Sequence, residues 1–92
     1  MNKKEYLLGL LAEEGAEIAQ AANKCARFTT THRHYETSNL DRLNVELGDL
    51  FSVLYLLEKE LKVEFVKTHN PEKLERIEAY MQISRDLGAL DG

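Results

Sequence analysis

Two short acidic runs are the part of this 92-residue sequence best suited to chemistry. They read Glu13-Glu14-Gly15-Ala16-Glu17 and Glu46-Leu47-Gly48-Asp49. Acids three or four residues apart share a helix face and repel one another. The surrounding stretches, residues 5–23 and 43–58, contain seven acids and no lysine or arginine. An ordinary solvated helix face alternates opposite charges, so a plain structural bundle does not explain this pattern.

A bound divalent cation would explain the crowding of these acids. Glu14 takes a position on an apolar stripe, between Leu11 and Ile18, where an unpartnered carboxylate is costly. Acids on two facing helices could surround a cation with oxygen atoms. An oxygen-only ligand set favours Mg²⁺, with Mn²⁺ as a substitute, over zinc. The five acids exceed the charge of one such ion, which favours either a second metal ion or a carboxylate left free as a base.

Each acidic run also contains a glycine in the middle of a predicted helix. A glycine there costs about 1 kcal/mol relative to alanine. We interpret Gly15 and Gly48 as positions where a missing side chain lets the two helices approach or leaves room for a ligand. Ordinary close packing is the alternative.

Hydrophobic periodicity predicts two long helices that carry the acids. The first covers about residues 3–28, and the second begins at Ser38 or Asn39, both good N-caps, and runs to about Val63. Leucines follow the second helix at alternating steps of four and three residues. The intervening residues 29–38 have no apolar period and are rich in threonine and histidine, so we expect a loop.

A third helix is predicted by Asn70 as N-cap and Pro71 in the first turn, with a stop near Gly88. Its expected inner face consists of Leu74, Ile77, Met81 and Ser84. Residues 63–66 are too few to establish a strand. The fold class is therefore all-α, with three main helices in one domain over residues 1–92.

Composition and hydropathy bear on assembly, location and partners. Residues 50–57 are apolar nearly all round the second helix, and two further helices in so short a chain cannot cover them. We therefore expect the bundle to be completed as a homodimer or a homotetramer. A net charge of −4 argues against a nucleic-acid partner. The single cysteine, Cys25, together with the lack of a signal segment or an apolar run of about 20 residues, favours a cytoplasmic protein without membrane attachment.

The two acidic runs resemble the EExxE…ExxD signature of MazG-like all-α nucleoside triphosphate pyrophosphohydrolases. The 28 residues between Glu17 and Glu46, and the apolar run after Asp49, are similar to the family pattern over about residues 7–61. The resemblance implies hydrolysis of an NTP or dNTP to its monophosphate and pyrophosphate, in house-cleaning or dNTP-pool control. The Mg²⁺ ligands that it implies are Glu14, Glu17, Glu46 and Asp49. It also implies that Glu13 is a further ligand or the catalytic base for the attacking water.

Cations that hold the substrate phosphates are the next expectation from this resemblance, since family members carry them on a later helix. Lys73 and Arg76 on the third helix are candidates. Lys24 is another, because it lies seven residues after Glu17 and so on the same face, with Arg27 one turn further.

Two other classes of protein deserve comparison. A catalytically idle helical module, used for oligomerisation or nucleotide sensing, would share the same fold. A di-iron carboxylate bundle needs Glu-x-x-His pairs on its helices, and all three histidines fall outside the predicted helices. We expect no specific role for His32 and His34, although a metal or phosphate contact is the alternative. For the flanking aromatics Phe28 and Tyr35 we expect core or rim packing, with stacking on a base as the alternative.

Overall fold

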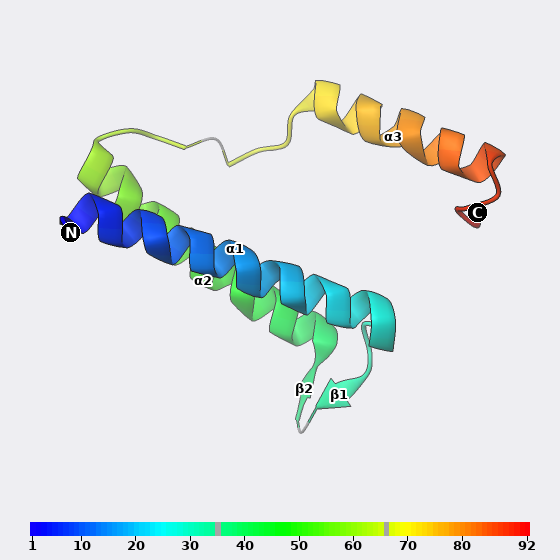
Figure 1. Cartoon of the computed structure of the whole chain (residues 1–92), viewed down its shortest axis with the longest axis horizontal. Helices are drawn as coiled ribbons and strands as arrows, with labels where there is room; N and C mark the ends of the chain where they lie inside the picture. Colours follow the sequence, from blue (N-terminus) through cyan, green and yellow to red (C-terminus); the bar gives the residue numbers. More distant parts are fainter. Residues whose placement is uncertain (35, 66) are drawn as a thin grey trace.

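The computed structural model describes residues 1–34, 36–65 and 67–92 and consists mainly of helices (Figure 1). Its elements in chain order are α1 (Lys3–Phe28), β1 (Arg33–His34), β2 (Thr37–Ser38), α2 (Asn39–Leu61) and α3 (Pro71–Asp86). The predicted all-α class with three helices is confirmed. Within these described ranges, no helix is both long enough and apolar enough to cross a membrane.

Side-chain caps set the helix boundaries. The capping side chains, each accepting a hydrogen bond from a backbone amide of the first turn, are Asn2, Ser38 and Asn70. The second helix ends at Leu61, slightly before the expected position, because Lys62 adopts the left-handed conformation with φ 56°. Gly88, with φ 77°, follows the end of α3 as predicted.

A short hairpin, rather than the predicted loop, connects the two long helices. β1 and β2 pair antiparallel. The buried Asn39 side chain donates to the carbonyl oxygens of Thr29 at 2.9 Å and Lys24 at 3.4 Å. The end of α1 is thereby fastened to the start of α2. Such two-residue strands are too short for an alternating pattern, which explains why the prediction was wrong here.

The α1–α2 pair contains the small core of the chain. The two helices lie side by side and run in opposite directions (Figure 1). Leu7, Val53 and Leu57 form the buried cluster, near the N-terminal end of α1. Residues 63–65 form no strand, as expected, and contact this core through Phe65. Val66 and Tyr35 lie outside the described residues.

Much apolar surface of the single chain stays uncovered. On α2, Phe51 and Tyr55 are more than half exposed. The expected inner face of α3 is also exposed, with Leu74 at 44% and Ile77 at 42%, because α3 stands apart from the α1–α2 pair (Figure 1). The prediction that this face is buried is therefore wrong for the single chain.

The radius of gyration and the accessible surface also show that the single chain is not compact. Its radius of gyration is 16.8 Å, whereas a compact domain of this length has about 12 Å. Its accessible surface is 7563 Å², against about 5,500 Å² for a compact protein of this mass. The described chain is an open helix pair with a third helix extended beside it.

Candidate metal centre

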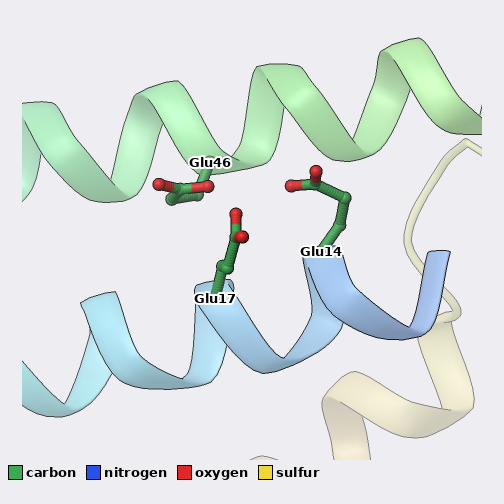
Figure 2. Close-up of side chains that lie close together, drawn as sticks. All are labelled: Glu14, Glu17 and Glu46. Carbon is green, nitrogen blue, oxygen red and sulfur yellow. The ribbon is translucent and has the colours of Figure 1, made fainter. Parts of the chain in front are cut away.

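Three glutamates from the two long helices meet in the space between them. Glu14 and Glu17 extend from α1, and Glu46 extends toward them from α2 (Figure 2). One carboxylate oxygen from each lies within 4.8 Å of the others. Residues at i and i+3 share a helix face, so α1 presents two carboxylates at the point where α2 presents the third. The structure thus brings together acids from both sequence runs.

Two of these carboxylates have oxygens that are buried without a donor. Glu14 Oε2 and Glu46 Oε2 have no hydrogen-bond partner among the residues that the structure describes. A buried polar oxygen in that condition is unfavourable unless it gains a proton, a donor or a cation. A hard divalent cation is suited to such oxygens. These residues therefore fit a metal ion on the basis of their own chemistry.

The crowding also changes the proton affinity of the cluster. Partial burial raises the pKa of Glu14 above its usual 4.5, and the charges of Asp49 and Glu46 raise it further. Hydrogen bonding to Glu17 raises the pKa of Glu46, and partial burial and neighbouring negative charge add to that rise. The Arg42 guanidinium opposes the rise at Glu46. Without a cation, Glu14 and Glu46 hold protons more tightly than isolated glutamates do.

The remaining two predicted acids lie at the edge of this group. Asp49 is exposed and outside the three-carboxylate cluster, yet its charge raises the pKa of both Glu14 and Glu46. Glu13 is exposed, and its charge acts on Glu14. The structure therefore divides the five acids into a converging trio and two neighbours.

The mid-helix glycines do not serve helix contact within the chain. A Cβ added at Gly15 or Gly48 would meet nothing within 4 Å. The interpretation that they let α1 and α2 approach, and the alternative of close packing, are both wrong for the single chain. Room for a ligand beside the acids stays a prediction.

Two cations lie next to the acids. Lys24 was predicted to lie on the same helix face as Glu17. Together with Glu17 and Glu46, it lines a pocket of about 260 Å³. Arg42 also lines this pocket, and its Nε lies 3.9 Å from Glu46 Oε1. Arg42 was not predicted, although its position four residues before Glu46 places the two side chains on one helix face.

The other predicted cations lie away from the acids in the single chain. The Arg27 guanidinium carbon lies 5.2 Å from the centre of the Phe28 ring, so this side chain contacts an aromatic residue instead. Lys73 and Arg76 are exposed on α3, which is separated from the α1–α2 pair (Figure 1).

A larger pocket of about 600 Å³ adjoins the first one. It lies where the end of α1, the hairpin and the start of α2 meet. Its lining residues are Lys24, Phe28, His32, Thr37, Ser38, Asn39 and Arg42. Because Lys24 and Arg42 line both pockets, the acids and the aromatic residues border adjacent spaces. Phe28 is 52% exposed, so it does not pack in the core of the single chain, and its position at the rim of this pocket fits either rim packing or contact with a ligand.

No protein-family model, curated protein or solved structure matches the chain. The resemblance of the two acidic runs to the MazG-like signature therefore stays a prediction. Function is inferred from the glutamate trio, the two cations and the adjacent pockets.

Proposed function

We propose that the protein is a Mg²⁺-dependent nucleoside triphosphate pyrophosphohydrolase that converts an NTP or dNTP and water to the monophosphate and pyrophosphate. The observation that carries this proposal is the meeting of Glu14, Glu17 and Glu46 beside a pocket lined by Lys24 and Arg42. A triphosphate needs both features, because its oxygens are neutralised by a metal ion and by basic side chains.

Each group has a role in this reaction. The trio and Asp49 would hold Mg²⁺, which supplies neutralisation of charge on the triphosphate and on the departing pyrophosphate. Lys24 and Arg42 donate hydrogen bonds to phosphate oxygens. Water attacks the α-phosphorus as the bond to the β-phosphate oxygen breaks. Glu13, which is outside the trio, is the proposed base that accepts the water's proton.

Pyrophosphate release by acid-to-amide variants tests this proposal. Glu17→Gln and Asp49→Asn keep the side-chain shape but remove a ligand charge, so kcat/KM should fall by about 100-fold or more. Glu5→Gln is the matched control, because Glu5 is an exposed acid of α1 outside the cluster. Unchanged Mg²⁺-dependent activity in the first two variants would contradict the proposal.

A homodimer or homotetramer is the proposed assembly. The single chain exposes about 2,000 Å² more than a compact protein of its mass, whereas a standard interface buries about 800 Å² per partner. Apolar side chains of both α2 and α3, including Phe51 and Ile77, contribute to this exposure. Sedimentation velocity should give a mass above 10.6 kDa, and a monomer at micromolar concentration would contradict the assembly.

A catalytically idle nucleotide-sensing module is the second candidate. The observation that favours it is the separation of α3, which carries Lys73 and Arg76, from the α1–α2 pair (Figure 1), because it leaves fewer cations for the leaving group within one chain. Calorimetry distinguishes the two candidates. Mg²⁺ and nucleotide binding without turnover, across canonical and modified NTPs and dNTPs, would establish the idle module.

A further inference from the structure

The two long helices carry a row of groups whose chemistry changes along its length. On α1 the row is Glu14, Glu17, Lys24 and Phe28, and on the antiparallel α2 it is Glu46, Arg42 and Asn39. At about 1.5 Å per residue, Glu17 and Phe28 are separated by about 16 Å along α1. This is the scale of an extended nucleoside triphosphate and is too long for inorganic phosphate alone.

The far end of the row has an exposed aromatic pair. Phe28 lines the larger pocket, and its ring centre lies 6.4 Å from that of His32 at an interplanar angle of 44°. The backbone amide of His32 donates to Thr29 Oγ1 at 3.2 Å, which fixes the start of the loop. The side-chain amide of the buried Asn39 also donates to the backbone carbonyl oxygen of Thr29. The aromatic pair thus lines this pocket and does not lie inside the core.

The middle of the row is cationic. Lys24 makes no ion pair within residues 1–34, 36–65 and 67–92, and Arg42 has only its 3.9 Å contact with Glu46. Both side chains border the acids on one side and the aromatic pocket on the other. A ligand that satisfies the whole row is anionic in the middle, binds metal at one end and has a flat ring at the other.

We infer that the pocket of Phe28, His32 and Asn39 binds the nucleoside of the substrate, with the base stacked on the aromatic pair and the phosphates running past Lys24 and Arg42 toward the glutamates. The pocket volume of about 600 Å³ is in the usual range for a small-molecule site. The inference rests on the proposed function for the identity of the triphosphate. It adds that affinity depends on the base and not only on the phosphates.

Calorimetry with two ligands tests this subsite in the presence of Mg²⁺. The first ligand is an α,β-imido dNTP, in which the bond to be cleaved is replaced, and the second is inorganic tripolyphosphate, which lacks a nucleoside. Phe28→Ala should weaken binding of the imido nucleotide by about 10-fold or more, the effect of losing one base–aromatic stack. It should leave tripolyphosphate affinity unchanged, which also shows that the variant is folded.

Two further variants complete the test. Phe28→Tyr keeps an aromatic ring and should retain nucleotide affinity. Tyr80→Ala, at an aromatic residue of α3 that is 69% exposed, is the matched control and should bind both ligands normally. The inference is overturned if Phe28→Ala changes the two affinities equally, changes neither, or if the wild-type protein does not bind the imido nucleotide.

Failure of the proposed function gives a different result. Suppose that the wild-type protein releases no pyrophosphate, and that Phe28→Ala loses nucleotide affinity but keeps tripolyphosphate affinity. The protein would then have the nucleoside subsite but not the proposed activity. A protein that releases pyrophosphate and is insensitive to Phe28→Ala would have the catalysis without the subsite.

Discussion

The two ends of the α1–α2 pair differ in what their side chains do for the protein. At the end that contains the start of α1, Leu7, Val53 and Leu57 exclude water and hold the helices together. Toward the hairpin, the contact surface changes to Glu14, Glu17 and Glu46, whose crowding opposes packing. The comparison shows one helix pair divided into a stabilising apolar segment and an acidic segment suited to a ligand.

Removal of the central core side chain should have the largest effect. Leu57 is fully buried, so Leu57→Ala should lower the free energy of unfolding by about 2–5 kcal/mol. Leu87→Ala, at a residue 78% exposed, should change it by about 0.5 kcal/mol or less. Urea unfolding measures both, and equal losses would show that the apolar segment is not the stabilising one.

Magnesium should stabilise the acidic segment. At a Mg²⁺ concentration 100 times its Kd, the free energy of unfolding should rise by about 2.7 kcal/mol. Glu46→Gln should remove this gain, whereas Glu60→Gln, an acid of α2 near Lys3 and outside the cluster, should keep it. Thermal unfolding with and without Mg²⁺ is the measurement. A gain retained in Glu46→Gln would place the metal elsewhere.

A smaller effect is expected at the glycine of the second acidic run. A Cβ at Gly48 meets nothing within 4 Å, so Gly48→Ala should stabilise the metal-free protein by about 1 kcal/mol through helix propensity. If the glycine leaves room for substrate, the same variant should raise KM in the pyrophosphate assay. An unchanged KM in Gly48→Ala would show that Gly48 does not leave room for the substrate.

The pH dependence of stability should show the smallest effect. The pKa values of Glu14 and Glu46 are raised in the folded state, so this state binds protons more tightly than the unfolded state above pH 4.5. The contribution of the pair to stability should therefore decline as pH rises from 4.5 through the raised pKa values. Urea unfolding of metal-free protein should show a shallower decline for Glu46→Gln than for Glu60→Gln. If the free energy of unfolding fell equally steeply with pH in both variants, this would contradict the inference that crowding raises the pKa values of Glu14 and Glu46.

Local signals in the sequence predicted the helices well. Ser38 and Asn70 cap α2 and α3 as predicted, and the apolar period of α1 gives its bounds correctly, although its cap Asn2 was not predicted. Capping and periodicity depend on neighbouring residues, which a single sequence contains. The meeting of Glu14 and Glu17 with Glu46 also follows from periodicity, once both helices are placed side by side.

Features that depend on distant contacts were not predictable in the same way. The hairpin depends on backbone bonds such as that from the Asn39 amide to His32, which leave no side-chain pattern. Whether the apolar face of α3 is buried depends on the surface that packs against it. The sequence places Leu74 and Ile77 on that face, but it does not show whether the covering surface belongs to this chain or to another. For Phe28, packing was favoured over stacking on a base, because the sequence alone does not show which residues surround the ring.

Titration with Mn²⁺, followed by electron spin resonance of the free ion, tests the central claim most directly. The account predicts that the wild-type protein binds Mn²⁺, that Mg²⁺ competes for the site, and that Glu17→Gln loses this binding while Glu5→Gln retains it. Equal Mn²⁺ affinity in Glu17→Gln and the wild type would contradict a metal centre at the meeting point of the three glutamates.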